Sequence, residues 1–262
     1  MQLNKTNKYD MNNDVSIVVI SCDKYMDLWM PFFNCFFKYW PDCPYPIYLA
    51  TNELEYPDPR IKPIKIGLDQ DYSSNILRIL EQVESQWLIL WIEDLIIKSK
   101  IDTVKILELI NLAQKNNVGY LKLSVDTPLV FPHNKKEIIA PIPKKVKYRS
   151  AIGLALYRKD VLLKLLIPGA NAWELDKSKK SNFLEDSFYG LTTNLRCNPP
   201  IPVINAVIKG KWSYEAIRFF KKEGLNVNIS NRSRISLKSH LYIKLYNFRL
   251  NIYRILRKYW HD

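Results

Sequence analysis

One apolar run, Trp87-Leu88-Ile89-Leu90-Trp91-Ile92, limits most strongly what this chain can fold into, and it ends in Glu93 and Asp94. A run without polar alternation is typical of a strand buried on both faces, as in a parallel sheet with helices on each side. Such sheets bind ligands beyond the carboxyl ends of their strands. Glu93 and Asp94 are therefore predicted at that edge, where carboxylates can hold a divalent cation and, through it, phosphate oxygens. From this run alone, the interpretation that they mark the strand end and face water has equal support.

The first half of the chain alternates strand-like and helix-like segments. This pattern indicates an α/β fold with a Rossmann-like, mainly parallel sheet flanked by helices. Strands are predicted over residues 15–21, 47–51, 61–66, 118–124, 151–157 and 201–209, besides the run at Trp87. Helices are predicted over 28–40, from Ser73 or Ser74 to 84, from Asp102, and over 159–166, 214–223 and 238–259. We expect one main domain, residues 1–231, and a basic amphipathic C-terminal helix within residues 232–262.

Composition excludes several classes of protein. The 262 residues are 47% apolar, which is enough for a sizeable core. The 7 glycines form neither G-x-G-x-x-G nor a Walker-type loop, which argues against dehydrogenase and P-loop folds. Four cysteines without a C-x-x-C pair, and three histidines, do not favour a zinc site. Reduced thiols and the lack of an apolar leader or spanning segment predict a cytoplasmic protein.

The formal net charge is +13, and the excess is concentrated at the end of the chain. Residues 232–262 contain eight Lys or Arg and one Asp. Apolar residues at helical spacing accompany these cations: Leu241, Leu245, Phe248, Ile252, Ile255 and Tyr259, with Tyr253 and Trp260 beside them. A helix of this kind suits an anionic membrane surface, so we expect peripheral attachment to the inner face of the cell membrane. Docking of the apolar stripe on the domain or on a second subunit is the alternative.

Three groups of acids fall where a sheet-edge site could use them. Asp23 follows the first predicted strand, Glu93 and Asp94 follow the Trp87 strand, and Glu174 and Asp176 occur together in Trp173-Glu174-Leu175-Asp176. An early acid can bind a nucleoside, a middle one a metal that bridges phosphates, and a late one can act as general base. Each group alone is weak evidence, because exposed acids are common. Their order along an α/β chain is the stronger signal.

On these residues the sequence resembles the GT-A glycosyltransferases, in particular bacterial members associated with cell-surface polysaccharides. The matching pieces lie in residues 21–52, 87–95, 156–176 and 205–224, and together they extend over most of the chain up to Gly224. The resemblance implies transfer of a sugar from a nucleotide-diphosphate donor to a glycan or lipid-linked acceptor, with inversion if a carboxylate acts directly as base.

The resemblance also implies individual roles in donor binding. Asp23 would contact the base or ribose, and Asp71 and Asn75 would face the donor from the start of their helix. Asp94, with Glu93, stands where the metal-binding acidic motif of the family falls. Leu95 occupies the place where that motif often has another acid, so a Mn²⁺ or Mg²⁺ requirement is left open.

For catalysis, the resemblance assigns Glu174 as the base that deprotonates the acceptor, with Asp176 as second choice. Lys211, with Lys209 nearby, would neutralise the leaving diphosphate.

Three other functions are alternatives to glycosyl transfer. A nucleic-acid-binding protein would fit the charge, but no known nucleic-acid-binding signature is visible, so no nucleic-acid partner is expected. A nucleotidyltransferase would usually have a glycine-rich loop after the first strand, which Ser21-Cys22-Asp23-Lys24 is not. A non-catalytic sugar-nucleotide-binding protein is the third alternative.

Overall fold

The computed structural model describes residues 14–126 and 128–259, and side chains in that range except those of residues 250, 251 and 253–259. The strands are β1 (Val15–Ile20), β2 (Ile47–Thr51), β3 (Ile61–Lys65), β4 (Trp87–Ile92), β5 (Leu95–Ile97), β6 (Tyr120–Lys122), β7 (Ile139–Pro141), β8 (Ala155–Arg158), β9 (Phe188–Leu191), β10 (Val203–Asn205), β11 (Val207–Ile208) and β12 (Lys211–Trp212). The α-helices are α1 (Trp29–Tyr39), α2 (Tyr72–Glu81), α3 (Thr103–Lys115), α4 (Lys159–Leu165), α5 (Ala172–Lys177), α6 (Tyr214–Glu223) and α7 (Leu237–Tyr259). Short 3₁₀ helices are η1 (Asp23–Leu28), η2 (Lys180–Asn182), η3 (Thr193–Leu195) and η4 (Ile229–Asn231).

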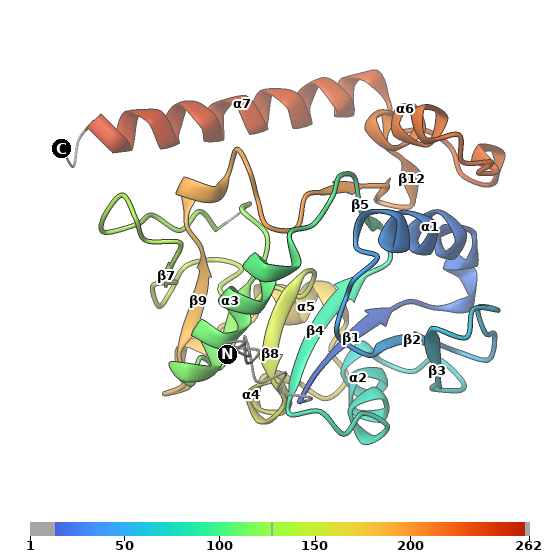
Figure 1. The fold of residues 1–262 in the computed structure, drawn as a ribbon, viewed down its shortest axis with the longest axis horizontal. Helices are drawn as coiled ribbons and strands as arrows, with labels where there is room; N and C mark the ends of the chain where they lie inside the picture. The colour runs from blue at the N-terminus through green and yellow to red at the C-terminus, as the bar shows by residue number, and fades with distance from the viewer. Residues whose placement is uncertain (1–13, 127, 260–262) are drawn as a thin grey trace, which may run out of the picture.

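An eight-stranded mixed sheet forms the centre of the molecule, in the order β3-β2-β1-β4-β8-β6-β9-β7 (Figure 1). Strands β3, β2, β1 and β4 are parallel, as the alternating pattern of the first half predicts. Strand β8 lies antiparallel between β4 and β6, and β7 lies antiparallel to β9. The predicted α/β fold with a mainly parallel sheet is confirmed, although the sequence pattern did not predict the antiparallel strands.

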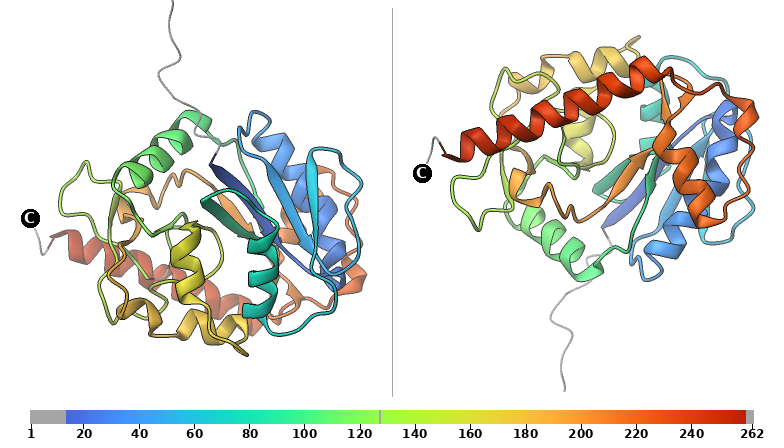
Figure 2. Two further views of the ribbon diagram at one scale, coloured as in Figure 1. Left: turned by 90° about the horizontal axis from the view of Figure 1, so that it is seen from below. Right: turned by 90° about the horizontal axis from the view of Figure 1, so that it is seen from above.

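Each face of the sheet is covered by helices, which explains why the run of β4 is apolar throughout (Figure 2). Along β4, Ile89 and Trp91 belong to the core beneath α1 and α3, whereas Leu88 and Leu90 belong to the core beneath α2 and α4. Because successive side chains of a strand point to opposite faces, a strand between two helical layers buries side chains on both faces. The prediction that the Trp87 run is buried on both faces is therefore confirmed.

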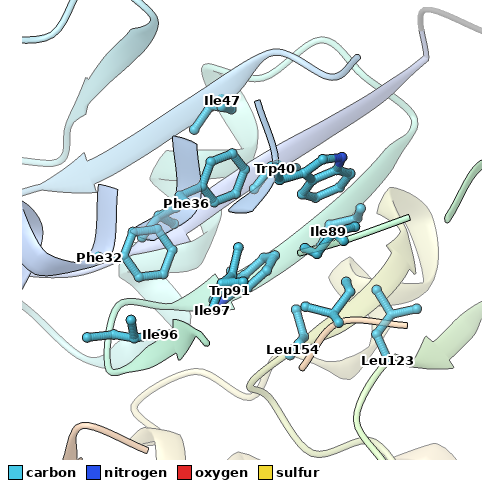
Figure 3. Close-up of a cluster of buried hydrophobic side chains, with 14 of the residues drawn as sticks. Phe32, Phe36, Trp40, Ile47, Ile89, Trp91, Ile96, Ile97, Leu123 and Leu154 are labelled. Atoms are coloured by element: carbon cyan, nitrogen blue, oxygen red, sulfur yellow. The ribbon is translucent and has the colours of Figure 1, made fainter. Parts of the chain in front are cut away.

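Aromatic side chains of α1 fill the core on one face (Figure 3). Phe32 and Phe36 meet Trp91 edge-on, with ring centroids 5.9 and 5.8 Å away. The indole Nε1 of Trp91 donates to the carbonyl oxygen of Leu95 at 2.7 Å, so this buried polar atom is satisfied. The aromatic residues of α1 thus pack the core on this face of the sheet.

One predicted helix start differs from the structure. Residue Asp71, and not Ser73 or Ser74, caps α2, because its extended backbone lets its carboxylate accept from the Ser74 backbone N–H at 3.0 Å and from the Ser74 hydroxyl at 2.5 Å. The predicted start of α3 is confirmed, since Asp102 caps it by accepting from Lys105 N–H. The predicted end of α6 at Gly224, which has φ 68°, is also confirmed.

The C-terminal part of the chain is joined to the main sheet region before α7 begins. The backbone N–H of Trp212 donates to Ser233 and the N–H of Ile235 donates to Trp212, so residues 233–235 run beside β12. Helix α7 then crosses one side of the molecule (Figures 1 and 2). Within residues 14–126 and 128–259, no helix has both the length and the apolar content that crossing a bilayer needs. Trp260, which the sequence pattern places on the helix, lies outside the described residues, as do the side chains of Tyr253, Ile255 and Tyr259.

Candidate functional site

The main cleft lies where the winding of the sheet reverses. In the strand order β3-β2-β1-β4, the chain adds β2 and β3 on one side of β1 and then places β4 on the opposite side of β1. In register, Ile20 at the end of β1 pairs with Ile92 at the end of β4. Ligands of open α/β sheets bind beyond the carboxyl ends of the strands at such a reversal.

A cavity of about 430 Å³ is present at this place. Its lining comes from the segments after β1, β2 and β4, from α2 and from α5. The ionisable carboxyl groups in the lining are those of Asp69, Glu93, Asp94 and Asp176. This volume lies in the range of clefts that bind small organic ligands.

The two acids after β4 are both held at the floor of the cleft. Glu93 is 5% exposed, and burial, followed by the nearby Asp94 carboxylate, raises its pKa to about 8. Burial also raises the pKa of Asp94 to about 6. The backbone carbonyl of Asp94 accepts from the N–H of Ala206 at 2.7 Å, which fixes the turn between β4 and β5. The adjacent carboxyls thus share a site that disfavours full ionisation.

Arg232, from the segment before α7, is close enough to this acid pair to affect its ionisation. The guanidinium of Arg232 makes two hydrogen bonds of 2.7 Å to the carboxylate of Asp27, and both side chains are largely buried. The same guanidinium lies over the ring of Tyr25, 4.2 Å from its centroid, and Tyr25 lines the cleft. The positive charge of Arg232 lowers the pKa of Glu93 and Asp94 and so partly offsets the effect of their burial.

The structure places Asp23 next to the cleft, with its carboxylate turned to the backbone. Its oxygens accept from the N–H groups of Asn52, Glu53 and Leu54, at 3.1, 3.1 and 3.3 Å. Its own N–H donates to the side-chain oxygen of Asn52 at 3.1 Å. Asp23 therefore joins the loops after β1 and β2, while its neighbours Cys22 and Asn52 line the cavity.

Of the two donor-binding residues predicted at the start of α2, Asn75 lines the cleft and Asp71 does not. Asp71 is the cap of α2, and hydrogen bonds from Ser74 lower its pKa. Asn75 lines the cleft, and its side-chain amide donates to the carboxylate of Asp69, which lines it too. Tyr72 also lines the cleft, and its hydroxyl is buried.

The two candidate bases on α5 have different surroundings. Glu174 forms a capping box with Asn171: its carboxylate accepts from the Asn171 N–H at 2.8 Å, and the Asn171 side chain accepts from the Glu174 N–H at 3.0 Å. Asp176 lines the cleft, where burial raises its pKa to about 6. One of its oxygens accepts from the N–H of Ile152 at 2.7 Å. Trp173, on the same helix, also lines the cleft although it is 63% exposed.

The two lysines proposed for the leaving group lie on a hairpin. Lys209 and Gly210, with φ of 50° and 75°, form the two-residue turn between β11 and β12, and Lys211 follows in β12. Positive φ at both central positions is characteristic of a type I′ hairpin turn. Both lysines are solvent-accessible, and neither lines the cavity.

The structure thus brings Asn75, Glu93, Asp94 and Asp176 to one cavity, and it places Asp23, Asp71, Glu174, Lys209 and Lys211 outside its lining. Sequence reasoning missed Asp69, Tyr72 and Arg232. Tyr72 had one available signal, because it directly follows Asp71 at a predicted helix start. Arg232 had none beyond the basic character of its segment, because its approach to Asp27 depends on the path of the chain across 205 residues.

No protein-family model matches the chain, and no curated protein sequence matches it significantly. Several solved structures are similar. Residues 1–349 of TarS from S. aureus share 13% identity over 82% of this chain and 66% of that chain, with a TM-score of 0.43. The mannosyltransferase PcManGT from Pyrobaculum calidifontis, solved with GDP-Man and Mn²⁺, shares 11% identity over 80% and 64%, with a TM-score of 0.47. A cytidylyltransferase from Leptospira borgpetersenii shares 11% identity over 86% and 98%, with a TM-score of 0.48.

At 11–13% identity and TM-scores of 0.43–0.48, these matches are partial likenesses of structure. The chain spans just under two thirds of the two glycosyltransferase chains. TarS has also been solved in complex with UDP-GlcNAc.

The donor atoms for a metal ion are limited. Across the described ranges, no three His, Cys, Asp or Glu side chains are grouped closely enough to enclose a metal ion. Asp94 and Glu93 supply carboxylate oxygens, which suit Mg²⁺ or Mn²⁺. Mg²⁺ is commonly held by one or two carboxylates together with substrate phosphates and water. The acid pair therefore fits a cation that a phosphorylated ligand completes.

Proposed function

We propose that this protein is a glycosyltransferase that moves a sugar from a nucleotide-diphosphate donor to an acceptor hydroxyl. The observation that carries the proposal is the placement of two sets of carboxyls in one cavity at the reversal point of the sheet: Glu93 and Asp94 after β4, and Asp176 on α5. One set suits a cation and the donor phosphates, and the other suits an attacking hydroxyl. The sugar, the nucleotide and the acceptor are for the experiments below to identify.

In this proposal the nucleoside lies toward Cys22 and Asn52, beyond the ends of β1 and β2. The diphosphate lies toward Asp94, which would hold a divalent cation with Glu93 in support. A cation there supplies Lewis-acid stabilisation of charge on the diphosphate. Asn75 and Asp69 bind donor hydroxyls from the α2 side. Lys211 and Lys209 remain candidates for neutralising the diphosphate only if their hairpin approaches the cleft when the donor binds.

We assign the role of base to Asp176, and Glu174 is the rival. The oxygen of Asp176 that does not bind Ile152 takes the proton of the acceptor hydroxyl. The acceptor oxygen then forms its bond to the anomeric carbon, and the bond from that carbon to the diphosphate oxygen breaks with its electron pair leaving on the diphosphate. A pKa of about 6 suits a base that works near neutral pH. Direct attack of this kind inverts the anomeric centre.

Donor binding is tested by thermal shift with UDP-, GDP-, CMP- and dTDP-sugars, each with and without Mn²⁺ or Mg²⁺. We expect one nucleotide class to raise the melting temperature by mass action. The Asp94→Asn variant should lose most of this shift, whereas Asp58→Asn, which alters an exposed ion pair with Arg60, should keep it. If no nucleotide sugar raises the melting temperature under any condition, the proposed function is wrong.

The base is tested with the donor identified in this way. Asp176→Asn should abolish transfer and keep the donor-induced thermal shift, while Glu174→Gln should retain most activity because Gln can still accept in the capping box. The reverse result would assign the base to Glu174.

We also propose that α7 attaches the protein to an anionic membrane that carries the acceptor. Five apolar side chains of α7 lie at helical spacing and are 40–66% exposed: Leu237, Leu241, Leu245, Phe248 and Ile252. The helix sequence contains six Lys or Arg and no Asp or Glu. An exposed apolar stripe with this charge is complementary to anionic lipid headgroups. Arg232, just before α7, contacts Tyr25 at the cleft, so attachment would hold the cleft near the lipid surface.

Pelleting with vesicles tests this attachment. We expect the protein to pellet with phosphatidylglycerol vesicles and much less with phosphatidylcholine vesicles. The double variant Leu241→Ser/Leu245→Ser should lose binding, whereas Leu68→Ser, which changes a side chain 86% exposed elsewhere, should not. If the wild-type protein does not pellet, or forms a dimer that the double variant disrupts, the stripe is a protein interface and the membrane proposal is wrong.

A further inference from the structure

One buried hydroxyl in the cleft lacks a partner. The Tyr72 hydroxyl oxygen is inaccessible to solvent and makes no hydrogen bond with any described residue. Its ring lines the cavity, and the carboxyls of Asp176 and Glu93 contribute to raising its pKa after the larger effect of burial. A buried hydroxyl without a partner is unfavourable, and each such group in a folded protein calls for an explanation. An oxygen atom of a ligand bound in the cleft would give the Tyr72 hydroxyl the hydrogen-bond partner that it lacks.

A large aromatic side chain borders the same part of the cleft. Trp173 is in the first turn of α5, three residues before Asp176, and 63% of it is exposed. An exposed Trp presents a wide, rigid apolar ring face on which a ligand can stack. The C–H face of a sugar ring is also apolar, while its hydroxyl edge is polar. The ring of Trp173 suits the C–H face of such a sugar, and the carboxylate of Asp176 suits its hydroxyl edge.

The charge of the lining limits what can bind there. Within the described residues, the charged side chains that line the cavity are all acidic, namely Asp69, Glu93, Asp94 and Asp176, and no Lys or Arg is among them. A carboxylate or phosphate on the ligand beside Asp176 would meet like charge in a partly buried site. A sugar hydroxyl, in contrast, can donate to a carboxylate and accept from a phenol.

We propose that Tyr72, Trp173 and Asp176 form a subsite for an uncharged pyranose ring of the acceptor, and that the subsite rejects acidic sugars. The ring stacks on Trp173, donates its reacting hydroxyl to Asp176 and accepts from the Tyr72 hydroxyl. The assignment of this ring to the acceptor rests on the proposed function. Tyr72 acts here as a positioning and specificity residue.

Matched pairs of glycosides test the charge selectivity. The probes are the 4-nitrophenyl glucoside and glucuronide, the galactoside and galacturonide, and the N-acetylglucosaminide, titrated calorimetrically in the presence of the nucleotide. We expect at least one uncharged glycoside to bind, with its acidic counterpart, where it has one, weaker by about tenfold or more. Equal binding of an acidic counterpart, or binding of no uncharged glycoside, would overturn the proposal.

Two variants with matched controls test the residues. Trp173→Ala should weaken glycoside binding about tenfold or more, whereas Phe183→Ala, which removes a side chain 81% exposed, should not change it. Tyr72→Phe should weaken glycoside binding about tenfold without lowering the melting temperature of the free protein, because no hydrogen bond is lost. Tyr120→Phe should lower it, since the Tyr120 hydroxyl donates to Ala151 at 3.0 Å.

Donor binding separates the two proposals. If the variants keep the donor-induced thermal shift and also keep full glycoside binding, the subsite is wrong while the proposed function stands. If the wild-type protein shows no donor-induced shift, the proposed function fails first, and selective glycoside binding that depends on Tyr72 and Trp173 would then indicate a sugar-binding protein.

Discussion

Replacement of Asp176 by Asn should make the protein more stable at neutral pH. The carboxyl of Asp176 is partly buried, and burial raises its pKa from the ordinary 3.8 to about 6. Its hydrogen bond from Ile152 is one that an amide oxygen can also accept. Asparagine therefore keeps the contact and removes the unfavourable charge. The same substitution should abolish transfer, so stability and activity are expected to move in opposite directions.

The size of the effect follows from linkage between protonation and folding. A group whose pKa is higher in the folded state binds its proton more tightly there, so its contribution to stability falls as the pH rises through the interval between the two pKa values. With values of 3.8 and about 6, the wild-type protein loses about 3 kcal/mol of unfolding free energy above the upper value. The variant lacks this loss. Its advantage should be about 0.5 kcal/mol at about pH 4 and about 3 kcal/mol at about pH 8.

Urea denaturation of both proteins across this pH range measures the difference. Only the pH-dependent part tests the reasoning, because any fixed effect of the substitution is present at every pH. Glu174→Gln is the control for an amide that replaces a carboxylate on the same helix outside the cavity lining. A stability difference between Asp176→Asn and wild type that stays constant, or that shrinks as the pH rises, would show that Asp176 is not a destabilised buried carboxylate.

Three further substitutions test the fold. Gly190→Ala should cost about 1–3 kcal/mol of stability because its new Cβ would lie 2.8 Å from a valine methyl group, whereas Gly153→Ala, with nothing within 4 Å, should be close to neutral; chemical denaturation measures both. Asp71→Ala should lower the denaturation midpoint by removing the cap of α2, and an unchanged midpoint would contradict the capping role. Arg232→Gln should destabilise the protein by about 1–3 kcal/mol, because it leaves the largely buried Asp27 without its charged partner; full stability would mean that the pair adds nothing.

Local patterns in the sequence were sufficient to predict most of the secondary structure. The Trp87 run, the helix of aromatic residues after residue 28, the cap at Asp102 and the stop at Gly224 each depend on neighbours within one strand or one helical turn. The spacing of apolar residues over a few helical turns likewise predicted α7. They did not predict that β8 lies antiparallel between β4 and β6, because strand order is decided by which segments pack together after long connections.

The candidate site was predicted in part for the same reason. Glu93 and Asp94 were located by the strand that precedes them, since the end of a buried strand is visible in the sequence. The sequence did not show which of Glu174 and Asp176 faces the cleft, because two residues on one short helix differ only in the direction in which their side chains point. Only the packing of α5 beside the cleft turns Asp176 inward and leaves Glu174 to cap its own helix.

The sequence by itself therefore determined which segments become strands and helices and which carboxylates stand at strand ends, because hydrophobic periodicity and capping act over a few residues. The tertiary structure decided which of those side chains share a cavity, which are used to hold backbone together, and which meet a distant partner such as Arg232. These outcomes depend on how close segments far apart in the chain come after folding, and no pattern of neighbouring residues records that distance.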